Sequence, residues 1–127
     1  MSCFWDTLIK KIRVEDIQRI LSINITHPRD FAEALKKKNC KTNNIVWNTN
    51  ELSEKEKEEN MTHINDYNSS TIQNGYLCSI CDPFLLLITE IFCIEISHHY
   101  NNNIIYYKHT EIVNYTITIY SNNNHMW

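Results

Sequence analysis

Apolar residues recur along the start of the chain with the period of a helix. They occupy positions i, i+3, i+4 and i+7 and so form one face, made of Trp5, Leu8, Ile9 and Ile12. The basic residues Lys10, Lys11 and Arg13 are expected to point the other way, and their charge suits the C-terminal end of a helix dipole. The pattern predicts a helix that begins near Cys3 and buries one face.

Boundary signals place the next elements. The helical period continues over 14–21, which predicts a second short helix. Pro28 suits the first turn of a third helix, which the lysines at 36–38 close. Residues 39–50 are expected to form a polar loop that carries a short apolar anchor at 45–47. Ser53 and Glu56 form a capping box, which predicts a charged helix to about residue 66.

The second half of the chain predicts one buried helix and three strands. Asp82 and Pro83 are expected to be the N-cap and the first residue of a helix over 83–92 that is apolar almost all round. Alternating segments at 93–98, 104–108 and 112–120 predict strands joined by short turns. Helices followed by strands indicate an α+β fold, with helices packed on a small antiparallel sheet arranged as a meander.

Composition restricts the classes of protein that fit. A chain of 127 residues is expected to form a single domain over 1–127, and we expect a monomer. The net charge of −3 argues against nucleic acid as a partner. The longest apolar run, at 84–88, is too short to span a bilayer, so no membrane partner is expected. Five scattered cysteines without a signal peptide favour the reducing cytoplasm. The abundance of Ile and Asn resembles AT-rich coding sequences, such as those of some viruses.

Cys78 and Cys81 form a CxxC motif with three possible interpretations. The pair is half a zinc site if Cys93, His98 or His99 supplies further ligands. A CxxC before a helix also occurs in thioredoxin-type redox proteins, but the strand-rich first half of that fold is missing. We take the default, two structural cysteines at the entry to a buried helix, and expect neither a metal nor a cofactor. A solvent-facing strand end is the expected setting of His98 and His99.

Cys3 and His125 stand at opposite ends of the sequence. Cys3 lies at the first turn of the predicted helix, where unpaired backbone N–H groups and the helix dipole lower a thiol pKa. His125 follows the last predicted strand and lies beside an aromatic residue. A first helix packed on the sheet would bring both residues to one place, which makes them a candidate nucleophile and base. Taken alone, Cys3 is also readily interpreted as a small apolar residue near a chain end.

The motifs together resemble the OTU (ovarian tumour) domain family of cysteine proteases and deubiquitinases, in a compact viral-type form. The nucleophile motif of that family, a Cys followed by an aromatic pair and a helix, is similar to residues 3–8. Its central segment is similar to Gly75, Tyr76 and Asp82 with the apolar helix and strand that follow. Its last strand ends in a loop with the catalytic His and an aromatic residue, similar to residues 123–127.

The resemblance implies a papain-like OTU architecture and acyl-transfer chemistry. Cys3 would attack the carbonyl at the C-terminus of ubiquitin or a ubiquitin-like modifier, and His125 would be the general base. The compartment implied for a viral member is the host cytosol. A groove with acidic residues is expected, because the tail of ubiquitin is basic.

The chain departs from the family pattern at two places. Members usually carry Asp-Gly-x before the Cys, where this chain has Met1 and Ser2. They commonly place Asp or Asn two residues after the His, where this chain has Trp127, whose indole N–H only donates. We therefore expect a backbone carbonyl or an asparagine side chain to orient His125, the candidates being Asn122, Asn123 and Asn124.

Three hypotheses follow. The first is a deubiquitinase that works through Cys3 and His125. The second is a catalytically inactive OTU-like module that binds ubiquitin or another partner, which the short leader before Cys3 and the position of Trp127 favour. The third is a small zinc-stabilised interaction domain that depends on Cys78 and Cys81.

Overall fold

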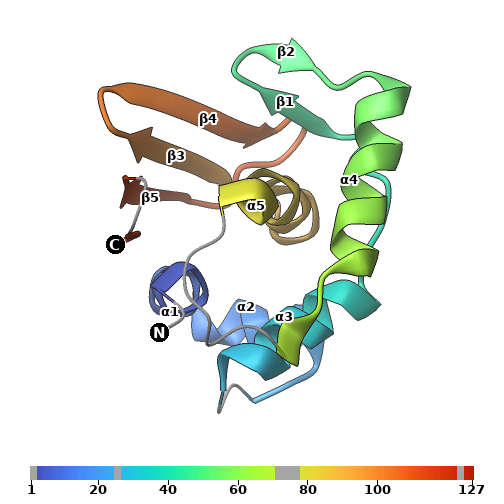
Figure 1. Ribbon diagram of the computed structural model, residues 1–127, viewed down its shortest axis with the longest axis vertical. Helices are drawn as coiled ribbons and strands as arrows, with labels where there is room; N and C mark the ends of the chain where they lie inside the picture. Colours follow the sequence, from blue (N-terminus) through green and yellow to red (C-terminus); the bar gives the residue numbers. More distant parts are fainter. Residues whose placement is uncertain (1–2, 25–26, 71–77, 123–124) are drawn as a thin grey trace.

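The computed structural model describes residues 3–24, 27–70, 78–122 and 125–127, with the backbone alone described at Cys3 and at residues 78–81. Helices dominate the first half and strands the second (Figure 1). The helices are α1 (Cys3–Lys11), α2 (Val14–Leu21), α3 (Pro28–Lys37), α4 (Glu54–Asp66) and α5 (Cys78–Phe92). The strands are β1 (Ile45–Trp47), β2 (Asn50–Glu51), β3 (Glu95–Tyr100), β4 (Asn103–His109) and β5 (Thr116–Ser121).

The strands form one mixed sheet in the order β2-β1-β4-β3-β5. β4 is antiparallel to both of its neighbours, β1 and β3, whereas β5 is parallel to β3. Figure 1 shows α5 close to the sheet, α4 along one flank and α1 to α3 below. The predicted α+β class, with helices packed on a small sheet, is confirmed.

The predicted antiparallel meander is wrong. In a meander β5 would pair with β4, but the segment 45–47 already occupies that edge of β4 as β1. After β4 ends, the chain passes the N-terminal end of β3. Backbone hydrogen bonds from Asn114 to Cys93 (2.8 Å) and from Glu95 to Tyr115 (3.1 Å) hold it there, and β5 pairs with the free edge of β3.

The predicted loop over 39–50 contains a β-hairpin instead. Trp47 pairs with Asn50, which leaves a two-residue turn. Both turn residues have positive φ, 50° at Asn48 and 70° at Thr49, as a tight turn between twisted strands requires. The side-chain oxygen of Asn48 also accepts a hydrogen bond from the backbone N–H of Tyr106 on β4 (2.8 Å).

The two helix starts predicted from capping signals have different outcomes. The capping box is confirmed: Ser53 accepts from the N–H of Glu56 (3.1 Å), and Glu56 accepts from the N–H of Ser53 (3.0 Å). The expected start of α5 at Asp82 and Pro83 is wrong, because the helix begins at Cys78 and contains Pro83. The carboxylate of Asp82 accepts a hydrogen bond from the hydroxyl of Tyr107 instead of capping the helix.

Trp5 anchors α1 in the core. Its side chain is 2% exposed and packs edge-to-face against Phe84 on α5, with ring centroids 4.8 Å apart. Phe31 on α3 lies edge-on to it at 5.9 Å, and its indole N–H donates to the hydroxyl of Tyr67 (3.1 Å). Residues 84–88 are fully buried, so α5 is the central helix that was predicted.

We expect Trp5→Ala to lower the free energy of unfolding by about 3–5 kcal/mol, because it leaves a cavity and an unpaired buried hydroxyl. Trp5→Phe, which keeps a ring, should cost less. Trp127→Ala is the matched control, since Trp127 is 50% exposed, and it should cost least. Urea unfolding followed by circular dichroism gives the three values. A loss at Trp5→Ala no larger than that at Trp127→Ala would contradict this placement of α1.

Candidate functional site

The two ends of the described chain lie side by side. The hydroxyl of Thr7 on α1 donates to the backbone carbonyl of Met126 (3.2 Å), and both residues are buried. Figure 1 shows α1 next to β5 on the side of the molecule where the chain ends. This hydrogen bond closes a separation of 119 residues in the sequence.

The chain reaches α1 because it folds back after β5. Tyr120 and Trp127 exchange both of their backbone hydrogen bonds, at 2.9 and 2.8 Å. At the turn, the N–H of Asn122 donates to the carbonyl of His125, and the side-chain oxygen of Asn122 accepts from the N–H of His125, both at 2.9 Å. The fold-back places His125 at the end of the sheet that faces α1.

A cleft of about 240 Å³, which we call the α1 cleft, lies between α1 and this C-terminal segment. One wall belongs to α1 and the other to the last three residues, and together they comprise Asp6, Thr7, Lys10, Lys11, His125, Met126 and Trp127. His125 is exposed and lines this cleft.

Cys3 is the first residue of α1. It precedes Thr7 by four residues, a rise of about 6 Å along the helix axis. Its backbone therefore lies about one helical turn from the contact between α1 and Met126, while its side chain is outside the described residues. The structure thus places the backbone of Cys3 on the helix that faces His125.

The ring of His125 lies in a row of stacked aromatic side chains. It stacks on Trp127 with centroids 5.7 Å apart and planes at 17°, and Trp127 stacks on Tyr120 at 6.1 Å. His99 on β3 continues the row at 4.7 Å from Tyr120. Trp127 therefore contacts His125 through its ring face.

Of the three asparagines expected to orient His125, the structure describes only Asn122. Asn123 and Asn124 are not among the described residues. Asn122 is described, and its side-chain oxygen binds the backbone N–H of His125. This contact shapes the turn that carries the imidazole, and the assignment of an asparagine to orient the ring stays a prediction.

Sequence reasoning missed the role of Lys11. It was expected to point away from the apolar face of the helix, towards its C-terminal dipole end, and no partner was predicted for it. Its ammonium donates to the carbonyl of Thr118 on β5 and lies 5.7 Å from the centre of the Tyr120 ring. Thr118 is at the outer strand of the sheet, so Lys11 ties α1 to that edge. The strand order, which periodicity does not reveal, was needed to find this contact.

The remaining cysteines do not resemble activated nucleophiles where they are described. Burial raises the pKa of both Cys40 and Cys93, and the nearby carboxylate of Glu90 raises it further by a smaller amount. The side chains of Cys78 and Cys81 lie outside the described residues, so the zinc and redox interpretations of that pair stay predictions. In the described part of the chain, no three His, Cys, Asp or Glu side chains are placed to hold a metal ion.

His98 was predicted to face solvent at a strand end, and this prediction is wrong because its side chain is buried. It is 3% exposed, and its Nε2 lies 2.6 Å from the hydroxyl of Ser121, at the base of the fold-back that carries His125. Its Nδ1 has no hydrogen-bond partner among the described residues. Burial lowers the pKa of His98 and the neighbouring His99 lowers it further, while Asp82 opposes them.

His109 and Glu90 form a polar cluster with a structural role that the sequence did not suggest. Nδ1 of His109 accepts from the backbone N–H groups of Glu111 and Ile112, both at 3.1 Å, so the ring proton is on Nε2. Nε2 lies 3.3 Å from the carboxylate of Glu90, which also accepts from the N–H of Asn44 (2.9 Å). The cluster fastens the end of α5 to β4 and to the segment before β1.

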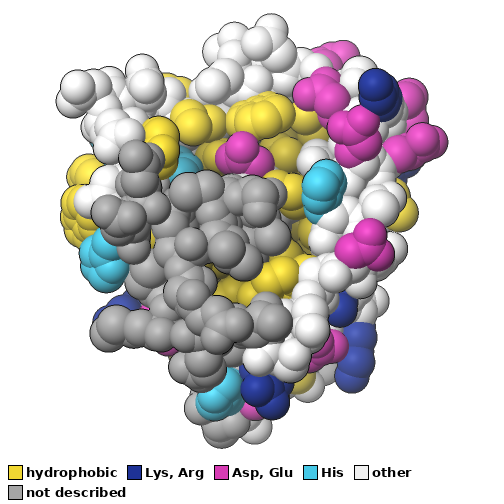
Figure 2. All heavy atoms as spheres, in the orientation of Figure 1, with side chains coloured by type: hydrophobic (Ala, Val, Ile, Leu, Met, Phe, Trp, Pro, Cys, Tyr) yellow, Lys and Arg dark blue, Asp and Glu magenta, His cyan; other side chains and the backbone are white. Residues whose placement is uncertain are grey.

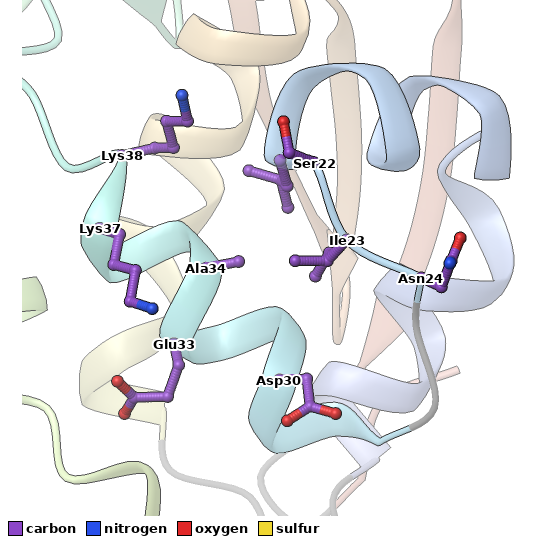
Figure 3. A pocket seen from close by; sticks show the side chains of 9 residues that line it. Ser22, Ile23, Asn24, Asp30, Glu33, Ala34, Lys37 and Lys38 are labelled. Atoms are coloured by element: carbon purple, nitrogen blue, oxygen red, sulfur yellow. The ribbon is translucent and has the colours of Figure 1, made fainter.

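A larger cavity, of about 650 Å³, lies between α3 and the segment that follows α2. Figure 3 shows Ile23 and Ala34 facing each other across it, with charged side chains at its rim. These charges are of both signs, Asp30 and Glu33 against Lys37 and Lys38. They do not converge on one kind of ligand, and we assign none to this cavity.

Two further findings bear on the kind of protein. Among the described residues, no helix is both long and apolar enough to cross a membrane. No protein-family model matches the chain, and neither a curated protein nor a solved structure matches it. The OTU family thus stays an interpretation of the motifs.

His98 should make stability depend on pH. Its pKa is lowered in the fold, whereas in the unfolded chain it is about 6.5. The unfolded state therefore binds the proton more readily, so this contribution is complete above pH 6.5 and is lost as the pH falls below it. Urea unfolding between pH 5 and 8 should show a smaller loss of stability in His98→Gln than in the original chain. Parallel curves for the two proteins would rule out the effect.

Proposed function

We propose that this chain is an OTU-like cysteine protease that hydrolyses peptide or isopeptide bonds after the C-terminus of ubiquitin or a ubiquitin-like modifier. Cys3 is the nucleophile and His125 the base. The observation that carries the proposal is the hydrogen bond from Thr7 to the carbonyl of Met126, which holds the helix of Cys3 against the segment of His125. The substrate class comes from the resemblance of the motifs to the OTU family.

The reaction proceeds in two acyl-transfer steps. The thiol proton of Cys3 passes to His125, and the thiolate attacks the carbonyl carbon of the terminal glycine. The resulting oxyanion accepts hydrogen bonds from the backbone N–H of Cys3 and from a neighbouring loop amide. The intermediate expels the lysine amine, which takes the proton from His125, and leaves a thioester. Water, deprotonated by His125, then hydrolyses the thioester and releases the thiol.

The α1 cleft fits part of this chemistry. The positive end of the α1 dipole favours the thiolate and the oxyanion at its N-terminus. Asp6, which also lines the cleft, offers one carboxylate to a basic substrate tail, but the ammonium groups of Lys10 and Lys11 line the cleft too and oppose it. The stacking of His125 on Trp127 restricts the imidazole on one face.

An inactive module that binds ubiquitin is the second candidate, and Trp127 favours it. The residue two positions after His125 accepts hydrogen bonds in the family but is an indole here. Without an acceptor for its second nitrogen, the imidazole tautomer is not fixed, and the nucleophile is not activated.

A ubiquitin with an electrophilic C-terminus distinguishes the two candidates. An active protease should form a covalent adduct at Cys3, found by mass spectrometry of the digested complex. Cys3→Ser should abolish the adduct, and Cys93→Ser, the matched control, should not. Ubiquitin binding without an adduct would establish the inactive module and overturn the protease. An adduct at Cys78 or Cys81, or neither binding nor an adduct, would also overturn it.

The role of His125 is tested on a fluorogenic ubiquitin amide. His125→Ala should lower single-turnover cleavage by at least about 100-fold, since general acid–base catalysis contributes 10²–10⁴. His27→Asn is the control, because His27 caps α3 through its side chain, and asparagine preserves an acceptor there. Unchanged cleavage in His125→Ala would remove His125 from the mechanism.

A further inference from the structure

One face of the sheet lies outside the core. Along β3, β4 and β5, alternate side chains are buried in the core, as at Ile96, Tyr107 and Ile119. The side chains between them point to the opposite face, because successive residues of a strand alternate, and they are partly or largely exposed. We call this second side of the sheet the outer face.

A row of large side chains crosses the outer face. Ile104 on β4 pairs with His99 on β3, which in turn pairs with Tyr120 on β5. Trp127 continues the row, because it exchanges both backbone hydrogen bonds with Tyr120. Tyr106 lies two residues along β4 from Ile104, so it adjoins the row on the same face. We call these five residues the outer patch.

The outer patch is large for an exposed apolar surface. Ile104, Tyr106 and Tyr120 are 44%, 45% and 39% exposed, and Trp127 is 50% exposed. These fractions amount to roughly 400 Å² of exposed side chain, since a fully buried aromatic side chain removes about 150–250 Å² from water. Contiguous apolar patches of this size mark interaction sites. A homodimer interface takes about 800 Å² per partner, of which about 65% is apolar, so the patch supplies most of that apolar area.

The stacking within the row restricts what can bind there. The ring of Tyr120 lies between those of His99 and Trp127, with centroids 4.7 and 6.1 Å away. The ring of Trp127 in turn lies between those of Tyr120 and His125, the latter at 5.7 Å. Both faces of each ring are therefore covered, and a nucleotide base, which binds by stacking on a free aromatic face, finds none there. The ring edges and Ile104 stay exposed and suit the apolar side chains of another protein surface.

The outer face carries charges of both signs. Glu95 and Lys108 pair across β3 and β4, while Glu51 lies at the β2 edge and Lys11 at the β5 edge. This balance favours neither nucleic acid nor a strongly basic partner. Most of the acidic side chains visible in Figure 2 lie along α4, on the other side of the molecule from β5. The net charge of −3 therefore does little to keep two outer patches apart.

We propose that the chain forms a two-fold symmetric dimer through its outer patch. A second copy supplies an equal apolar area and the same balance of charges, as a self-complementary interface requires. A two-fold axis along the strands, between β3 and β5, reverses the row in the partner. Ile104 of one copy then packs on Trp127 of the other, and the two sheets face each other as in a β-sandwich. The proposal replaces the monomer expected from the sequence, and it does not depend on the protease function.

The test is sedimentation velocity of the full chain in reducing buffer, at about 5 to about 500 μM protein. An interface of this size should give a Kd of about 10–100 μM, so the sedimentation coefficient should rise from that of a monomer to that of a dimer. Ile104→Lys should raise the Kd at least about 10-fold, because it places an unpaired charge in the interface. Ile112→Lys is the matched control and should leave the Kd within about 2-fold. Ile112 is 51% exposed but lies in the connection between β4 and β5, at the other end of the strands.

A mixture of two variants tests the contact between Ile104 and Trp127. Trp127→Glu alone should weaken the dimer as Ile104→Lys does, because each variant places two unpaired charges in the symmetric interface. In an equimolar mixture, the new lysine meets the new glutamate at one contact and the original pair remains at the other. The mixture should therefore associate more tightly than either variant alone. A chain that stays monomeric at about 500 μM or grows beyond a dimer, equal effects of Ile104→Lys and Ile112→Lys, or no gain in the mixture would each overturn the proposal.

Discussion

The arrangement of the candidate active site depends on how α1 is docked. Trp5 fixes the helix in the core through Phe31 and Phe84 and through its hydrogen bond to Tyr67. Thr7 lies on the adjoining turn and holds the C-terminal segment by its bond to Met126. A shift of Trp5 would therefore move the helix that carries Cys3 relative to His125. The burial of one indole is thus linked to the relative position of two sequence ends.

The strand order provides the second half of this arrangement. Because β1 occupies one edge of β4, β5 pairs with β3 and becomes the outer strand on that side. Only there does Lys11 reach the carbonyl of Thr118, and only there does the fold-back after β5 meet α1. In the predicted meander, β5 would lie beside β4, away from this edge. The error in topology therefore affected the neighbourhood of the site as well as the sheet.

Sequence patterns of a few residues correctly predicted the structural features that depend on neighbouring residues alone. The apolar face of α1 and the capping box at Ser53 and Glu56 are encoded within a few residues, and both are present. The β1–β2 hairpin was missed because its turn is Asn48-Thr49, which lacks the glycine that usually marks such turns. The burial of His98 and the partner of β5 depend on distant segments, which periodicity cannot show. The pairing of Cys3 with His125 was predicted from a first helix packed on the sheet and from the resemblance to a family, and it stays a prediction. The structure places the helix of Cys3 beside the segment of His125.

The central claim is that His125 shares the thiol proton of Cys3, and the pH dependence of Cys3 alkylation tests it most directly. Iodoacetamide labelling of Cys3 should reach half its maximal rate well below pH 8.5, the ordinary pKa of a thiol, and this midpoint should rise in His125→Ala. Cys93, whose thiol pKa is raised by burial, provides an internal reference in the same digest. A midpoint for Cys3 near 8.5, or one that is the same with and without His125, would contradict the account.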